Sequence, residues 1–458
     1  MTPPSAADLA REVQQYLDTH PDTQTFEVFL TDAHGIQRGK RLPASMMEKV
    51  AKEGIHLQRS IFSADVWSQD VVETGLIFES GDPDTVCRLV PASLRPVPWL
   101  ESPTAQALLW MEDEPGEPFF GDPRQVLRAM QSRLRALDLQ PIVATEIEFY
   151  LLAADRQPGD PPRPPRSPRT GHALAQSHLY GISELHGLEA FFREVERACQ
   201  QQGLPTDTLI AEHGPAQYEI NLQHVTDAVL AADHAVMLKS VIKGVAARHG
   251  MEATFMAKPY PEESGNGFHM HMSLQDACGQ NVFADAAEGE RMLHYGIGGV
   301  LRNMADTVAI LAPNRNSYRR FQPGSYAPMA PAWGYDNRTL AVRVPKSPAE
   351  ATRLEHRVAG ADTNPYLAVA AVLAGVLAGI EERCEPGPPV TGNAYEHELA
   401  RLPTSWETAL ERFEQSAHIA RYFGTEYQRL YATCKRQELD VFNRRITELE
   451  YESYLGIV

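Results

Sequence analysis

Hydrophobic and polar positions follow a helical period at the start of the chain and a strand period after it. Residues 8–18 place apolar side chains three and four positions apart, and Ser5 is a suitable cap for this predicted helix. Asp, Gly and Pro turns then separate short strand-like runs at residues 26–30, 36–40 and 75–78. The first part of the chain is therefore predicted to be rich in strands.

A stretch rich in Pro, Gly and acidic residues, 112–123, separates this part from the rest of the chain. We predict two domains, residues 1–115 and 116–458, as the length of 458 residues also indicates. Beyond the boundary, strands that carry charged residues alternate with helices. A run of Pro and Arg at 156–170 predicts a surface loop. The predicted helices are 123–137, 189–202, 227–249, the apolar run 366–380 and much of the charged region 406–454.

Charged side chains occupy strand positions where a buried strand would carry apolar ones. Residues two apart share one face of a strand, so several of these charges align. Each pattern alone also fits a solvated strand face, but together they favour a cavity lined by these side chains. The aligned sets are Glu146 with Glu148; His269 with His271 and Ser273; Arg353 with Glu355 and Arg357; and Glu212 with Glu219, on either side of the Gly214-Pro215 turn.

Such a cavity would hold more carboxylates than can stay ionised together. Like-charge repulsion raises the pKa values of neighbouring carboxyl groups, and divalent cations remove the conflict. Oxygen ligands with a single imidazole suit Mg²⁺ or Mn²⁺ better than zinc or copper. The carboxylates are Glu146, Glu148, Glu212, Glu219 and Glu355, the imidazole is His269, and Arg343, Arg353 and Arg357 could hold phosphate or carboxylate groups. Metals with arginines are the equipment of phosphoryl transfer.

Composition excludes several other classes of protein. The formal net charge of −18 argues against nucleic-acid binding. The five cysteines are scattered without a CxxC pair, which is typical of a reducing cytoplasm. The run 366–380 is short for a membrane span, and the N-terminus has no signal-peptide pattern. We expect a cytoplasmic protein that binds neither nucleic acid nor a membrane.

Several motifs, in this order, resemble those of glutamine synthetase over nearly the whole chain. They are Glu146-Ile-Glu148, the stretch from Glu212 to Glu219 with Gln217, Gly265-Asn-Gly-Phe-His-Met-His271, Asn316-Ser-Tyr-Arg-Arg320, Asn337-Arg338, and Arg353-Leu-Glu-His-Arg357 followed by Asn364-Pro-Tyr366. The resemblance implies an α+β fold, with a small N-terminal β-grasp domain and a large catalytic domain built on an antiparallel sheet. It also implies a ring of identical subunits, a hexamer or a dodecamer, with active sites between neighbours.

The resemblance assigns a role to each motif residue and implies ATP, two or more Mg²⁺ or Mn²⁺ ions, and glutamate as ligands. One metal site would comprise Glu148, Glu212 and Glu219, and the other Glu146, His269 and Glu355. Glutamate would be held by Gly265, Arg320, Arg338 and Arg357. ATP would be held by His271, Ser273, Arg343 and Arg353, with Asp207 a weaker candidate. The implied reaction forms γ-glutamyl phosphate, which an amine then attacks, with Glu212, Arg320 and Arg338 as catalytic residues.

Two anionic positions that the family uses to bind ammonium are missing. The N-terminal loop has Leu57 or Gln58 where an aspartate is expected, and the flap has Tyr326 where a glutamate is expected. The sequence thus resembles the γ-glutamylputrescine and polyamine branch of the family, whose role is polyamine catabolism and nitrogen metabolism. Further candidates for the amine site are Phe62, Asp65 and Trp67.

Three functions are compatible with this sequence: a ligase that joins glutamate to an organic amine, an ammonia-dependent glutamine synthetase, and a non-catalytic member of the family. The two missing anions favour the first function. The retained metal and arginine positions disfavour the third. The sequence leaves open which amine is used, which base deprotonates it, and how many subunits form the ring.

Overall fold

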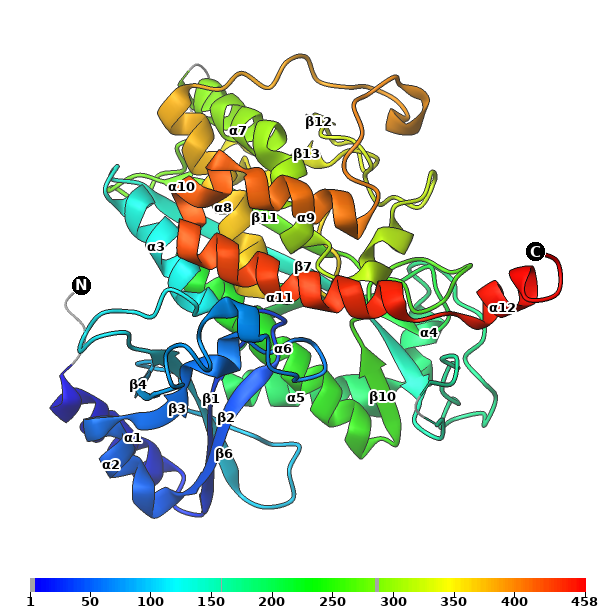
Figure 1. The fold of residues 1–458 in the computed structure, drawn as a ribbon. Helices are drawn as coiled ribbons and strands as arrows, with labels where there is room; N and C mark the ends of the chain where they lie inside the picture. The colour runs from blue at the N-terminus through cyan, green and yellow to red at the C-terminus, as the bar shows by residue number, and fades with distance from the viewer. Residues whose placement is uncertain (1–4, 158, 285–287) are drawn as a thin grey trace.

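Two β-sheets organise the described part of the chain, which in this computed structural model comprises residues 5–157, 159–284 and 288–458 (Figure 1). The first sheet has the order β2-β1-β6-β4-β3, with β5 paired to β6. Neighbouring strands in this sheet are antiparallel, except that β1 and β6 are parallel. Helices α1 (Ala6–Thr19) and α2 (Met47–Glu53) accompany it. Its strands are β1 (Thr25–Thr31), β2 (Gln37–Pro43), β3 (Ile55–Gln58), β4 (Asp84–Leu89), β5 (Arg95–Pro96) and β6 (Thr104–Met111).

The second sheet has the order β12-β13-β14-β11-β7-β9-β8, and β10 pairs with the far end of β7. All its pairs are antiparallel except β12 with β13. Its central strands carry the charged positions noted in the sequence. The strands are β7 (Gln140–Ala153), β8 (Thr206–Ala211), β9 (Gln217–Leu222), β10 (Met251–Thr254), β11 (Phe268–Gln275), β12 (Trp333–Tyr335), β13 (Val342–Val344) and β14 (Leu354–His356).

Helices pack around this second sheet and complete its core (Figure 1). They are α3 (Pro123–Arg135), α4 (Ile182–Gly187), α5 (Glu189–Gln202), α6 (Ala228–Arg248), α7 (Glu288–Leu311), α8 (Pro365–Glu382), α9 (Trp406–Gln415), α10 (Ala417–Phe423) and α11 (Thr425–Arg444). Helix α12 (Glu448–Tyr454) has no buried residue and projects away from the sheet. The antiparallel catalytic sheet with surrounding helices agrees with the α+β fold expected from the sequence. We keep the division into residues 1–115 and 116–458 as a proposal.

Most of the predicted elements are confirmed, and one strand is wrong. Ser5 caps α1 through a capping box, and Asp122 caps α3 with Pro123 in its first turn. The run 75–78 is a turn, because Gly75 takes a left-handed φ of 79° directly after a short 3₁₀ helix. The Ser80 hydroxyl also donates to the Leu76 carbonyl, which competes with strand pairing.

Helix α8 is the apolar centre of the catalytic part. Among the described residues it is long and apolar enough to cross a membrane, but 83% of it is buried within the structure. It extends the predicted run 366–380 by a few residues at its ends. We therefore interpret α8 as a core helix of the fold.

Close packing of α7 against α8 depends on glycines. A Cβ atom at Gly299 of α7 would lie 2.1 Å from the carbonyl oxygen of Gly375 and 2.4 Å from the amide nitrogen of Gly379, both in α8. These neighbours are backbone atoms, so no side chain can move aside. In contrast, a Cβ at Gly296 would be 3.5 Å from Val376 Cγ1, an ordinary contact.

We therefore expect Gly299→Ala to lower the free energy of unfolding by about 3 kcal/mol, because the two helices must separate to admit the methyl group. Gly296→Ala on the same helix is the matched control and should be neutral or stabilising by up to about 1 kcal/mol, since alanine favours helix over glycine. Thermal and denaturant unfolding of the two variants measure the difference. Equal stability of both variants would contradict this account of the α7–α8 contact.

Candidate active site

The register of four neighbouring strands brings the charged side chains together. His269 of β11 lies opposite Glu146 of β7, and Glu148 of β7 lies opposite Glu219 of β9. His271 lies opposite Glu355 of β14. Because the alternate residues of adjacent strands share a face, the pairing places these groups on one face of the sheet, in a row that runs diagonally across the strands.

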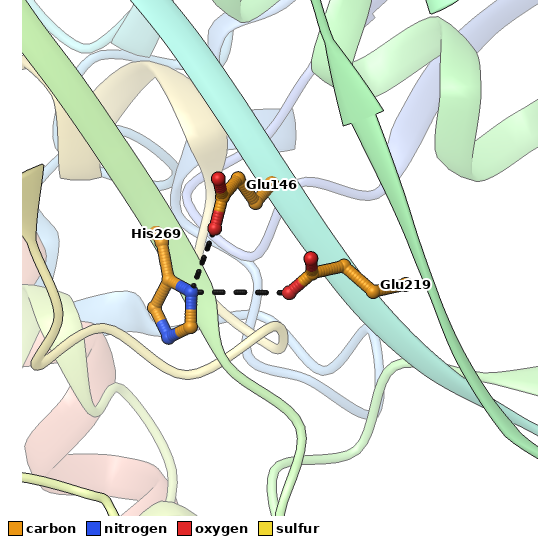
Figure 2. Close-up of side chains that lie close together, drawn as sticks. All are labelled: Glu146, Glu219 and His269. Carbon is orange, nitrogen blue, oxygen red and sulfur yellow. Dashed lines mark hydrogen bonds and ion pairs between the residues drawn. The ribbon is translucent and has the colours of Figure 1, made fainter. Parts of the chain in front are cut away.

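Glu146 contacts both histidines of β11. Its Oε2 lies 3.1 Å from His269 Nδ1, and its Oε1 lies 2.9 Å from His271 Nε2. His269 Nδ1 is also 3.9 Å from a carboxylate oxygen of Glu219. Glu148 accepts a hydrogen bond from the backbone amide of Gly267 at 2.6 Å. The three side chains drawn in Figure 2 come from three adjacent strands and point toward one another.

Two groups of ligand atoms in this row lie close enough to share a cation. One comprises Glu146, Glu219 and His269, and the other Glu146, His271 and Glu355; within each group the ligand atoms lie within 4.8 Å of one another. Carboxylates with imidazole form a hard, oxygen-rich donor set that suits Mg²⁺ or Mn²⁺. The residues fit divalent cations, and their division into the two predicted ligand sets stays a prediction.

The pKa values of the carboxylates are pushed apart. Burial, with the Glu148 charge next, raises the pKa of Glu212 to about 8, and burial with the Glu146 charge raises that of Glu219 well above its usual value. Burial alone would also raise the pKa of Glu146, but hydrogen bonds with His269 and His271 hold it well below its usual range. Without cations the row can hold only part of its negative charge.

Arginines form the other side of the site. Arg343 donates to Glu355 at 2.7 Å and to Asp336 at 2.6 Å, and Arg353 Nε donates to His271 Nδ1 at 3.1 Å. Burial would raise the pKa of Glu355, but the charges of Arg357 and the two histidines lower it to about 2. The buried Nε atoms of Arg343 and Arg357 have no hydrogen-bond partner among the described residues. Buried donors without a partner fit an anionic ligand, since leaving them unpaired is costly.

These two sides enclose a cavity of about 600 Å³. Glu355 lies behind its wall, buried and bonded to Arg343 and Arg357. The predicted residues that line the cavity are Glu146, Glu148, Glu212, Glu219, Gly265, His269, His271, Arg320, Tyr326, Arg338, Arg343, Arg353 and Arg357. The structure thus brings together most of the predicted site from seven separate stretches of sequence.

Two predicted nucleotide residues are outside this cavity. Asp207 lies exposed on β8 and contacts Thr208 and Gln223. Ser273 is buried on β11, two residues beyond His271, and is not part of the cavity wall.

Two of the residues suggested for an amine site are wrong. Phe62 is 2% exposed and packs on Phe119 in the core of the first sheet, so it cannot reach a ligand. Asp65 is buried, and its carboxylate accepts hydrogen bonds from the amides of Trp67 and Gln69 and from the Gln437 side chain. The alternation that predicts a strand does not show that the following loop turns these side chains inward. Trp67 is 43% exposed, and its role stays a prediction.

Sequence patterns did not identify several residues of the cavity wall, among them Asn221, His213 and Tyr180. Asn221 is 3.4 Å from Glu146, and its place two residues after Glu219 on β9 was a usable signal. His213 stacks on Tyr326 with ring centroids 6.4 Å apart and an interplanar angle of 10°. Tyr180, exposed and in the left-handed region with a φ of 60°, gave no signal in the sequence.

The chain is similar to known proteins over most of its length. The family model for the glutamine synthetase catalytic domain matches residues 120–454. The chain is 41% identical over 443 residues to gamma-glutamylputrescine synthetase PuuA of Escherichia coli (strain K12), which covers 96% of this chain and 94% of the relative. It is 36% identical to a glutamate–isopropylamine ligase of Pseudomonas sp, covering 98% of each. It is also 34% identical to gamma-glutamylethanolamide synthetase GlnA4 of Streptomyces coelicolor, covering 94% of this chain and 92% of the relative.

Among solved structures, ligand-free GmaS superposes with a TM-score of 0.82 at 27% identity and covers 96% of this chain and 98% of that chain. The chain belongs to the glutamine synthetase family. The resemblance seen in the motifs is therefore confirmed, as is the fold expected from it.

We expect Mg²⁺ to stabilise the protein more at pH 8 than at pH 6. The raised pKa values of Glu212 and Glu219 mean that the metal-free fold loses stability as the pH rises from the ordinary value of 4.5 toward about 8, because these groups must ionise side by side. A bound cation offsets this repulsion. The shift in the midpoint of thermal unfolding on adding MgCl₂ at the two pH values measures the effect.

Glu148→Ala should reduce the Mg²⁺-dependent shift at pH 8 by more than half and abolish turnover, with the fold retained. Glu189→Ala, which removes an exposed carboxylate on α5, is the control and should behave as the wild type. An equal Mg²⁺ shift in all three proteins would remove the row of carboxylates from the metal site.

Proposed function

We propose that this protein joins the γ-carboxylate of glutamate to an organic amine at the expense of ATP. Support comes from the carboxylate row facing an arginine wall, and from relatives named for putrescine, isopropylamine and ethanolamide products. Each of those names describes the relative. All three name an organic amine where glutamine synthetase uses ammonia.

The arginine wall is suited to two anions. Arg338, near Glu212, and Arg357, near Glu219, line the cavity and would hold the glutamate carboxylates. Arg320 packs against Gly265 in the same cavity. A Cβ at Gly265 would lie 2.7 Å from Arg320 Cγ, so only glycine allows this approach. Arg343 and Arg353 would hold the phosphates of ATP with His271. Cations bound to the carboxylates would screen the charges of phosphate and carboxylate so that they can meet.

We propose that the amine binds at the rim of this cavity. The exposed ring of Tyr326 is the observation that supports this position. Tyr326 is 53% exposed with a left-handed φ of 55°, and it stacks on His213, the neighbour of Glu212. Strained backbone of this kind concentrates at functional sites. An aromatic face attracts an alkylammonium ion, and each methylene that the amine buries contributes about 0.8 kcal/mol. Ammonium itself offers no carbon to bury.

Glu212 is our candidate for the base that takes the proton from the amine. It lines the cavity beside Tyr326 and His213, where an amine entering at the rim would meet its carboxylate. The deprotonated amine would then attack γ-glutamyl phosphate and displace phosphate. We also propose that the protein works as a ring in the cytoplasm, where an N-terminal loop of a neighbouring subunit would complete the acceptor site.

We expect a much higher kcat/KM with the best of putrescine, isopropylamine and ethanolamine than with ammonium, by a factor of about 100 or more. Burial of three or four methylene groups supplies enough free energy for such a ratio. Phosphate release with glutamate and ATP, measured for each amine side by side, is the test. If ammonium matches every amine, the protein is an ammonia-dependent glutamine synthetase; if no amine or ammonium supports turnover, the proposal is wrong.

Tyr326→Ala should raise the KM for the amine at least tenfold while the KM values for ATP and glutamate change little. The substitution removes the ring from the rim but leaves the arginine wall intact. Tyr326→Phe keeps the ring and is the matched control, with a KM close to the wild-type value. A wild-type amine KM in Tyr326→Ala would exclude this ring from the acceptor site.

A further inference from the structure

A second cavity of about 760 Å³ lies between the first sheet and helices α3 and α6. It shares no lining residue with the candidate active site. Its walls come from both sides of the boundary proposed near residue 115: from α1, α2 and β4 to β6 on one side, and from α3, α6 and the end of α5 on the other. Neither the family motifs nor the proposed reaction uses it.

Positive charge is concentrated in this cavity, although the whole protein is acidic. Six cationic side chains and three carboxylates line it, an excess of three positive charges within a chain of formal net charge −18. A local excess of one sign in a cavity with low-dielectric walls attracts ligands of the opposite charge. The cations are Lys52, Arg88, Arg95, Arg124, Arg128 and Arg135; the carboxylates are Glu112, Asp227 and Asp233.

Each of the three carboxylates is already paired with one arginine. Arg124 holds Asp233 with two hydrogen bonds of 2.9 Å, Arg135 contacts Asp227 at 3.2 Å, and Arg88 contacts Glu112 at 3.2 Å. Lys52 pairs with Glu48 on its own helix, outside the cavity.

Two arginines are left without a carboxylate partner among the described residues. Arg95 donates only to the carbonyl oxygens of Gln202 and Leu94, both at 2.7 Å, so its charge is not neutralised. The side chain of Arg128 makes no hydrogen bond or ion pair to another described residue, although the charge of Asp227, which is paired with Arg135, also acts on it. Both line the cavity: Arg95 belongs to β5 and reaches the end of α5 at Gln202, and Arg128 belongs to α3.

The arginines of helix α3 repel one another. Arg124 and Arg128 are four residues apart on one face, where like charges destabilise a helix. Burial, followed by the charges of Arg124 and Arg135, lowers the pKa of Arg128. This repulsion would be removed by a bound anion.

We propose that this cavity binds a small organic anion, a carboxylate or phosphate attached to an apolar or aromatic group, between Arg95 and Arg128. The guanidinium groups would hold the anionic end. The apolar part of the wall, with Leu89, Trp110 and Val229, would bury the rest of the ligand. The volume is that of an ordinary small-molecule site. Because the walls come from both sides of the proposed boundary, an occupied cavity would brace these two parts against each other.

The test measures the midpoint of thermal unfolding of the full chain with and without three probes: phenyl phosphate, phenylacetate and inorganic phosphate. A ligand that binds only the folded state raises the midpoint, by about 2 °C at tenfold excess over its Kd. We expect shifts with phenyl phosphate or phenylacetate and a smaller one with inorganic phosphate, which has no group to bury. The better of the two aromatic probes identifies the anionic group as phosphate or carboxylate.

Arg95→Gln/Arg128→Gln should lose the shift. Arg193→Gln/Arg444→Gln removes the same two charges from exposed helix surfaces and should keep it. In the absence of any anion, Arg128→Gln alone should unfold at the same or a higher temperature than the wild type, because it relieves repulsion on α3. The proposal is overturned if no aromatic probe shifts the wild type, if both double variants keep the shift, or if Arg128→Gln alone lowers the midpoint markedly.

Discussion

The mutual repulsion of carboxylates fixed on neighbouring strands is the constraint on which the rest of this site depends. Strand pairing places Glu146, Glu148 and Glu219 on one face of the sheet and fixes the spacing of their backbones. Part of the repulsion is relieved inside the chain, by the two histidines on Glu146 and by arginines on Glu355. The remainder appears as the raised pKa values of Glu212 and Glu219. Divalent cations are the ligands that suit such a row of carboxylates.

The carboxylates stay close together despite their repulsion because the sheet that carries them is rigid. The far face of the sheet packs on a continuous apolar core that includes α6 and α8, and α7 approaches α8 so closely that only glycine fits at the contact. A tightly packed interior has low compressibility, so the charged groups keep their spacing. The rim is different: Tyr326 and Tyr180 are exposed and adopt left-handed backbone conformations. The chain therefore combines a charged cavity wall on a tightly packed sheet with an exposed aromatic rim.

Sequence pattern predicted the cluster well because strand geometry is simple. Residues two apart must share a face, so Glu146 with Glu148 and His269 with His271 could be aligned without any structure. Loop residues follow no such rule. Phe62 and Asp65 were expected near a ligand but are buried, and the 75–78 run forms a turn since Gly75 is left-handed. His213 and Tyr326 meet only after the hairpin and the flap have folded, which no spacing along the chain reveals.

The long helix α11 crosses the molecule beside the first sheet (Figure 1). It contributes Leu430 and Cys434 to the apolar cluster of that sheet, and Glu438 accepts a hydrogen bond from the amide of Val66. The first strands to leave the ribosome therefore lack part of their core until more than 300 further residues have been made. Domains ordinarily fold in the order of their synthesis. Here the first sheet must wait for α11, and translation has to pass that helix before the first sheet can reach its final stability.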